Sequence, residues 1–381
     1  MAESAERGGR TPPAMDPALR SHAATLDDLR RGLADLAMDG LLSSDPALDG
    51  RYGGNARRIW RTEMESRLAH LAEAVACGRP GLFASHASWS AEALRTRGVP
   101  EGDIRAHMEQ LSAAVAAELP DAAATAVGPY LVEAARALER PFSGSGLLDG
   151  EGRESTLARL YLLHLLQRDK EQATALALDA LRGGLPLGDV YERVLAPAMA
   201  EIGRMWHMQE ASIADEHYCT AATRSIVTQL RVAASGQARP ADGRRAICCS
   251  VAGDMHEVGI RMVADLLELD GWSVEFLGCN VPAGEVVMSV EERSTSPASA
   301  FHLVVASAST TLALRSLGDL VATMRASPFA SAVPLLVGGG ALAEEPGLGA
   351  TLGADAVAHS LRDAVVQAAL LVPSRAGRLP R

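Results

Sequence analysis

The sequence AICCSVAGDMHEVG at residues 246–259 decides the fold of the last third of the chain. Its first six residues are apolar or small, as in a buried strand, and the polar DMHEVG run follows directly. Similar apolar runs, each followed by a helical pattern, lie at residues 272–277, 303–306 and 335–337, with a weaker one at 354–358. This alternation predicts a doubly wound parallel α/β sheet, Rossmann-like, over residues 245–372, with ligands bound at the carboxyl ends of its strands.

A histidine stands at that ligand-binding edge. His256 follows the first predicted strand on the loop that leads into the next helix. Neutral imidazole is a good ligand for cobalt, and the carboxylate of Asp254 is placed to accept the second ring N–H and so fix the tautomer. Gly259 would let the backbone approach a large planar ring closely, where a side chain would collide.

Small residues follow the third and fourth predicted strands: Ser307, Ser309, Gly338 and Gly339. We expect them to open a slot between the strand ends. In order, Asp-x-His-x-x-Gly, Ser-x-Ser and Gly-Gly resemble the signature of cobalamin-binding domains of the methionine synthase and mutase type. The resemblance implies that the nucleotide tail of cobalamin lies in the slot and that His256 replaces it as the lower axial ligand of cobalt.

Two features depart from that signature. The interval between Gly259 and Ser307 is a few residues longer than expected, and Ser309 stands where the family often has Leu or Thr. The alternative interpretation is a flavodoxin-like or nucleotide-binding domain in which His256 is an incidental loop residue. Three elements in the right order, each at a predicted strand end, favour cobalamin.

Before the sheet, residues 153–235 hold four helical patterns with short connections, which predict an antiparallel four-helix bundle. The third pattern ends in Trp206 and His207. A capping box of Ser212 and Asp215 begins the fourth helix. We therefore expect the two residues after Asp215 to lie in its first turns.

Those two residues are Glu216 and His217, which follow Trp206 after nine intervening residues. This pattern, a Trp followed after nine residues by Glu-His, resembles the cap motif of the CarH/LitR-type light-sensing cobalamin proteins. The resemblance implies that Trp206, Glu216 and His217 enclose the 5′-deoxyadenosyl group of adenosylcobalamin, and that His207 becomes the upper cobalt ligand after light. The alternative is that Trp206 is bundle core and Glu216-His217 a solvated helix start.

The front of the chain is predicted to be helical. The sequence predicts a partly disordered segment at residues 1–54 and an N-terminal domain of four helices at residues 55–140. A flexible linker is predicted at residues 141–152. CarH-type regulators begin with a basic DNA-binding domain, which this sequence does not show. The architecture resembles the photocobilins, which also use a bilin, and this implies biliverdin as a second chromophore.

Within the N-terminal domain, His86 and Trp89 share a helical face, with Arg95 and His107 nearby in sequence. These residue types can cradle a tetrapyrrole and its propionates. Ordinary, partly exposed packing residues are the interpretation that we favour for them.

Charge and composition limit the partners. The net charge is −11 and no segment gathers a Lys/Arg cluster, so we expect no direct nucleic-acid binding. No run of about 18 apolar residues occurs, so we expect no membrane segment. Five cysteines without zinc-ligand spacing indicate free thiols and a cytoplasmic protein.

Together these features predict an α/β plus all-α protein that senses light through adenosylcobalamin and is not an enzyme. Loss of the adenosyl group would drive a change in conformation or assembly, passed to a homo-oligomer or a separate output protein. The main alternative is a corrinoid methyl carrier of a methyltransferase system. A mutase small subunit is disfavoured, because such subunits do not need the bundle.

Overall fold

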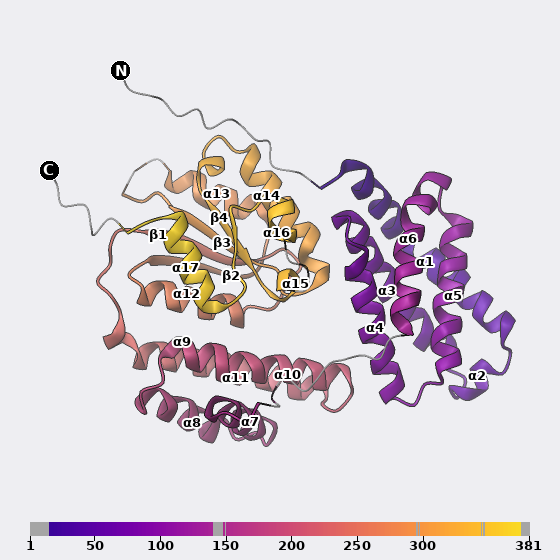
Figure 1. The fold of residues 1–381 in the computed structure, drawn as a ribbon, viewed down its shortest axis with the longest axis horizontal. Coiled ribbons are helices and arrows are strands. Elements are labelled where there is room, and N and C mark those ends of the chain that lie inside the picture. Colours follow the sequence, from indigo (N-terminus) through magenta and orange to yellow (C-terminus); the bar gives the residue numbers. More distant parts are fainter. Residues whose placement is uncertain are drawn as a thin grey trace.

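A computed structural model describes residues 15–139, 148, 150–294, 296, 298–343, 345 and 347–374. They form an N-terminal helical unit, a helical bundle and an α/β domain (Figure 1). The linker predicted at 141–152 falls mostly outside the described residues.

The N-terminal unit contains α1 (Pro17–Ser44), α2 (Leu48–Arg51), α3 (Ala56–Cys77), α4 (Pro80–Thr96), α5 (Glu101–Glu118) and α6 (Asp121–Leu138). The prediction of partial disorder for residues 1–54 is wrong for α1, a helix of 28 residues. Apolar side chains at helical spacing, among them Leu26, Leu33 and Leu41, are buried against the rest of the unit, and this burial stabilises the helix. Residues 1–14 lie outside the described residues.

The bundle consists of α7 (Arg153–Leu166), α8 (Lys170–Arg182), α9 (Leu187–Val190), α10 (Ala196–His207) and α11 (Ile213–Ala233). A single π turn, η1 (Tyr191–Leu195), joins α9 to α10 in one continuous helix. Pro197, which has no N–H to donate, stands in the first turn of α10 directly after it.

The α/β domain has five parallel strands: β1 (Arg245–Val251), β2 (Ser273–Val281), β3 (Leu303–Ser307), β4 (Leu335–Gly338) and β5 (Ala356–Val357). Their order is β2-β1-β3-β4-β5, which confirms the predicted doubly wound sheet. The helices of the domain are α12 (Val258–Leu269), α13 (Ala283–Arg293), α14 (Leu314–Ala326), α15 (Gly340–Ala343), α16 (Leu348–Leu352) and α17 (Leu361–Leu371). The chain changes direction in the sheet between β1 and β3, where such folds bind ligands.

The N-terminal unit shares a hydrophobic core with the sheet domain, whereas the bundle has a core of its own. One continuous core runs from the N-terminal unit into the face of the sheet covered by α13 and α14, with Leu71 and Leu317 among its members. The bundle has a separate core that reaches the α/β domain through Met262 and Leu266 of α12. Figure 1 shows the bundle lying along one side of the sheet domain and the N-terminal unit beside both. Among the described residues, no helix is long and apolar enough to cross a membrane.

Candidate cofactor site

His256 and Asp254 form a built pair at the end of β1. The Asp254 side chain is 0% exposed, and its Oδ1 accepts hydrogen bonds from Nδ1 of His256 at 2.8 Å and from the His256 backbone N–H at 3.0 Å. The His256 side chain is 65% exposed. Because Nδ1 is held by the carboxylate, Nε2 is the nitrogen free to ligate a metal.

Two further residues, Asn280 and Ser250, hold this loop, and the sequence pattern did not reveal them. Asn280, at the end of β2, accepts a hydrogen bond from the Gly253 N–H through its side chain at 2.7 Å, and its own N–H donates to the Asp254 carbonyl at 2.9 Å. Asn280 has a φ of 55°, a conformation that asparagine tolerates better than most residues. Ser250 donates to the His256 carbonyl at 2.9 Å. No motif links these positions, because they meet only when β1 and β2 pair.

The electrostatics of the pair favour a metal ligand. The hydrogen bond that His256 donates to Asp254 raises the pKa of His256 against the effect of burial, and the charges of Asp254 and Glu216 add to the rise. Burial alone would raise the pKa of Asp254, but hydrogen bonds from His256 and Ser309 outweigh it and leave that pKa lowered. Asp254 therefore stays ionised and makes the imidazole a stronger base.

The small residues after β3 and β4 lie close together. A Cβ on Gly339 would collide with the Ala308 carbonyl, and one on Gly340 would lie 2.8 Å from the Ser309 carbonyl oxygen. The Ala308 N–H donates to the Gly338 carbonyl at 2.9 Å. The glycines thus permit close contact between the backbones of the two loops.

Two other predicted residues of this edge occupy different surroundings. Ser307 is buried, with its Oγ 3.4 Å from Oγ of Ser309, and the Ser309 N–H donates to Oδ2 of Asp254 at 2.6 Å. The third strand end is therefore tied to the His256 pair. At Gly259 nothing lies within 4 Å of where a Cβ would stand, so that position borders open space.

The bundle presents its predicted residues near this edge. Trp206, at the end of α10, is 45% exposed, and the capping box of Ser212 and Asp215 begins α11 as expected. Glu216 bonds Nδ1 of the neighbouring His217 at 2.6 Å and accepts from the Thr220 hydroxyl at 2.8 Å. Arg224 of α11 forms an ion pair with Glu257, the residue after His256, so α11 contacts the loop at the end of β1.

The His207 ring packs against the N-terminal unit. Its ring stacks on that of Trp89 of α4, with centroids 3.1 Å apart and planes at 11°. Two further rings continue from Trp89 into the N-terminal unit, since His86 lies 6.1 Å from Trp89 and stacks on His70 at 3.5 Å. Burial lowers the pKa of His207 to about 4, and the nearby charge of Arg97 adds to this effect. The structure thus brings His86, Trp89 and His207 together in a row of rings that sequence spacing could not indicate.

The other two residues considered for a tetrapyrrole cradle do not join that row. Arg95 pairs with Glu101 at 2.9 Å and also donates to the Leu138 carbonyl. His107 is fully buried against Trp60, with ring centroids 4.8 Å apart.

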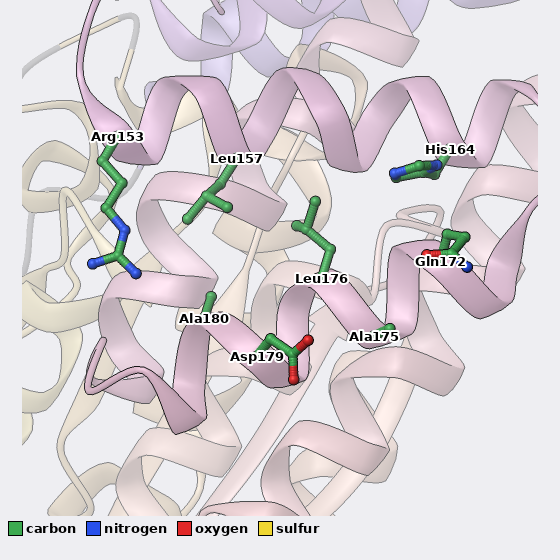
Figure 2. Close-up of a pocket in the computed structure, with 8 residues that line it drawn as sticks. All are labelled: Arg153, Leu157, His164, Gln172, Ala175, Leu176, Asp179 and Ala180. Atoms are coloured by element: carbon green, nitrogen blue, oxygen red, sulfur yellow. The ribbon is translucent and has the colours of Figure 1, made fainter.

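The bundle also carries a hollow of about 310 Å³ between α7 and α8. Figure 2 shows the side chains that line it: Arg153, Leu157 and His164 from α7, and Gln172, Ala175, Leu176, Asp179 and Ala180 from α8. These helices lie on the side of the bundle turned away from the sheet (Figure 1), so this hollow is separate from the His256 site. A second hollow, of about 450 Å³, flanks that site between α11 and α12 and is lined in part by Glu257 and Arg261.

The residues at the bundle–sheet edge suit a large, partly apolar ligand. Met255 is 67% exposed on the loop that carries His256, and Ile213 is exposed beside Trp206 at the bundle end. Exposed apolar side chains such as that of Met255, on the loop of a candidate ligand, are typical of a binding surface. With the free Nε2 of His256 as a nitrogen donor, this set fits a corrin ring that carries cobalt.

Comparisons with known proteins agree with that fit. Residues 157–231 and residues 244–370 each match a family model described as a B12 binding domain. The chain is 26% identical over 163 residues to the HTH-type transcriptional repressor CarH of Myxococcus xanthus, covering 42% of this chain and 52% of that protein. The chain therefore spans about half the length of this curated relative.

Solved corrinoid proteins are similar at lower levels. The monomethylamine corrinoid protein of Methanosarcina barkeri is 21% identical with a TM-score of 0.49, covering 57% of this chain and 100% of that one. A cobalamin-binding protein of Desulfitobacterium hafniense DCB-2 is 20% identical with a TM-score of 0.30, covering 56% of this chain and 98% of that one. The two family matches support the conclusion that the chain is a cobalamin-binding protein.

Proposed function

We propose that this cobalamin-binding protein is a light sensor that uses adenosylcobalamin and is not an enzyme. The observation that carries the proposal is the His256–Asp254 pair on a loop that the bundle contacts, since Arg224 of α11 forms an ion pair with Glu257, the residue after His256. His256 offers a nitrogen from the sheet, and Trp206 with Glu216 is presented by the bundle. The similarity to a CarH protein over 163 residues supports the same assignment.

In this proposal the chain holds the cofactor from two sides. His256, oriented by Asp254, is the lower ligand of cobalt, and Trp206, Glu216 and His217 contact the adenosyl group. When bound, adenosylcobalamin supplies a cobalt–carbon bond that visible light breaks. His207 would be the residue that supplies a second nitrogen once the adenosyl group has left, and this would move the bundle, so that dark and lit forms would differ in their contacts.

The test is illumination of the adenosylcobalamin-loaded protein. Green light is expected to change the absorption spectrum and the elution volume in size-exclusion chromatography. His207→Ala is expected to lose the adenosyl group but to give a different lit spectrum. A wild-type protein that keeps its dark spectrum under green light contradicts the light-sensing proposal.

We propose biliverdin as a second chromophore, bound by the N-terminal unit. Two buried polar atoms there have no partner among the described residues: Arg67 Nη1 and His86 Nε2. Unpaired buried donors are costly, and a tetrapyrrole offers carbonyl and propionate oxygens to them. Co-expression with a biliverdin-producing enzyme should give a red-absorbing protein, and a preparation without that band contradicts this assignment.

A corrinoid methyl carrier is the second candidate, favoured by the exposure of Trp206, Ile213 and Met255, which leaves the edge accessible to a protein partner. The two functions differ in the upper group that the bundle prefers. A sensor with an adenosyl cap is expected to bind adenosylcobalamin more tightly than methylcobalamin, whereas a carrier is expected to show the opposite order in a binding titration.

A further inference from the structure

The ends of α4 and α10 meet in a small contact, which we term the α4–α10 joint. Its parts are the stack of Trp89 on His207, a hydrogen bond of 2.8 Å from Nη2 of Arg97 to the His207 carbonyl, and the Thr96 hydroxyl 3.9 Å from the sulfur of Met208. Met208 is buried. The joint therefore fixes both the ring and the backbone of His207.

The surroundings of His207 belong to the N-terminal unit. The charged groups that act on it are Arg97 and Glu63, whereas those that act on His256 are Asp254 and Glu216. Nε2 of His207 is buried and has no polar partner within the described part of the chain. The nitrogen that would bind a metal is thus enclosed in the joint and lies outside the electrostatic surroundings of the cobalt site.

The joint is also a weak place in the assembly of the three units. The N-terminal unit and the sheet share one core, and Arg315 of α14 bridges Glu73 and Asp27 across them. The bundle core is separate. Because the N-terminal unit is fixed to the sheet, a shift of the bundle would separate α10 from α4 at the joint.

We propose that Trp89 is a positioning residue that withholds His207 from cobalt until the α4–α10 joint opens. The inference rests on the function proposed above, in which His207 becomes a cobalt ligand. With the joint closed, Trp206 is exposed while the neighbouring imidazole is stacked against α4. The N-terminal unit thereby sets the free energy needed to release His207 for ligation, and anything that loosens α4 from α10 lowers that free energy.

The first experiment needs no photochemistry. Wild type and Trp89→Leu are loaded in the dark with hydroxocobalamin, whose upper ligand exchanges, and the spectrum of the form with two histidine ligands is followed over time. A stacked aromatic pair contributes about 1 kcal/mol, so Trp89→Leu is expected to form that spectrum about fivefold faster. Trp89→Phe, which keeps a ring for the stack, is the matched control and should behave as wild type, while His207→Ala supplies the spectrum without the second histidine.

The second experiment locks the joint without touching either ring. In Thr96→Cys/Met208→Cys, mild oxidation of the cobalamin-free protein is expected to form a disulfide, seen as a mobility change on a non-reducing gel. The locked protein, loaded with hydroxocobalamin, should acquire the second histidine at least about tenfold more slowly than the same variant reduced beforehand. Wild type, with its five free cysteines, is treated in the same way as the control.

The outcomes separate this inference from the light-sensing proposal. Equal rates in wild type and Trp89→Leu overturn the positioning role, as does an oxidised Thr96→Cys/Met208→Cys that gains the second histidine at the reduced rate. Absence of His207-dependent ligation in Trp89→Leu overturns it as well. A protein that shows the expected dark rates but ignores green light when loaded with adenosylcobalamin leaves the joint in place and refutes only the light sensor.

Discussion

Asp254 and Glu216 are carboxylates that each bond a histidine, but the two pairs lie in different surroundings. The Asp254 side chain is fully buried and accepts the backbone N–H groups of His256 and Ser309 besides the His256 ring N–H. Glu216 lies in the first turn of α11, and its partner His217 is 71% exposed. The sheet side of the site is therefore fixed before any cofactor arrives, whereas the bundle side is held by local contacts and can rearrange.

This difference suits a switch. The fixed side keeps the cofactor in place, and the bundle side can exchange one set of contacts for another. The N-terminal unit belongs with the fixed side, because it shares a core with the sheet. Substitutions on the two sides can test this division between a fixed sheet side and a movable bundle side.

Replacing His256 should have the largest effect. His256→Ala removes the axial nitrogen and is expected to weaken cobalamin binding roughly 100-fold while the protein stays folded, and Asp254→Asn about tenfold. Titration followed by absorbance gives the affinities, and circular dichroism checks the fold. His22→Ala, on α1, is the control. Unchanged affinity in His256→Ala would show that the sheet side is not the ligand side.

Breaking the ion pair between Arg315 and Glu73, which bridges the N-terminal unit and the sheet domain, should have the second-largest effect. Burial raises the pKa of Glu73, and Arg315 offsets part of that rise. Arg315→Met leaves a buried carboxylate without its partner and is expected to cost about 2 kcal/mol of unfolding free energy at pH 8, by denaturant titration. A raised folded-state pKa means that stability is lost as the pH rises, so the cost should be smaller at pH 5.

A matched surface pair serves as the control for that bridge. Arg20→Met breaks the exposed pair with Asp319 at the same interface and should cost less than about 1 kcal/mol. Equal losses in the two variants would mean that Glu73 is not buried in solution and that the shared core does not hold the units together.

The effect of pH on cobalt ligation should be intermediate in size between the effects of the preceding and the following substitutions. A proton competes with cobalt for the His256 imidazole, so ligation falls about tenfold per pH unit below the pKa of His256. Because Asp254 raises that pKa, the fall should begin at a higher pH in wild type than in Asp254→Asn. Spectra of the loaded proteins between pH 5 and 8 measure it. Coincident curves would contradict the role of the buried carboxylate.

On the bundle side, Trp206→Ala should have a moderate and selective effect. Loss of the indole is expected to weaken adenosylcobalamin binding about tenfold and to leave hydroxocobalamin binding within about twofold, because in the proposed function the ring contacts only the upper group. Competition between the two cofactors gives the ratio. Equal weakening of both would assign Trp206 to the corrin and not to the adenosyl group.

His217→Ala should have the smallest effect. Its side chain is exposed, and Glu216 keeps its bond from Thr220 without it, so adenosylcobalamin affinity should change by less than about threefold. A loss as large as that of His256→Ala would show that the bundle side is as firmly built as the sheet side.

Much of this architecture follows from local patterns. The alternation of apolar runs with helical periods predicted the parallel sheet, and the position of His256 after β1 placed it at the ligand edge. Helix α1 escaped prediction because a Gly/Pro/Ser-rich start and the loop signals around residues 45–54 obscured its apolar face, which is stable only through packing on α3 and α5.

The sequence by itself determined the ligand pair, since Asp254 and His256 are two residues apart on one loop and need little beyond that loop to meet. Only the tertiary structure decided the role of Asn280, the close approach of the loops after β3 and β4, and the stacking of His207 on Trp89. Each of these joins residues far apart in the chain, and such contacts are set by how whole elements pack and not by any local spacing. His207 lies next to Trp206 in sequence, but the packing of α10 against α4 directs its ring toward the N-terminal unit.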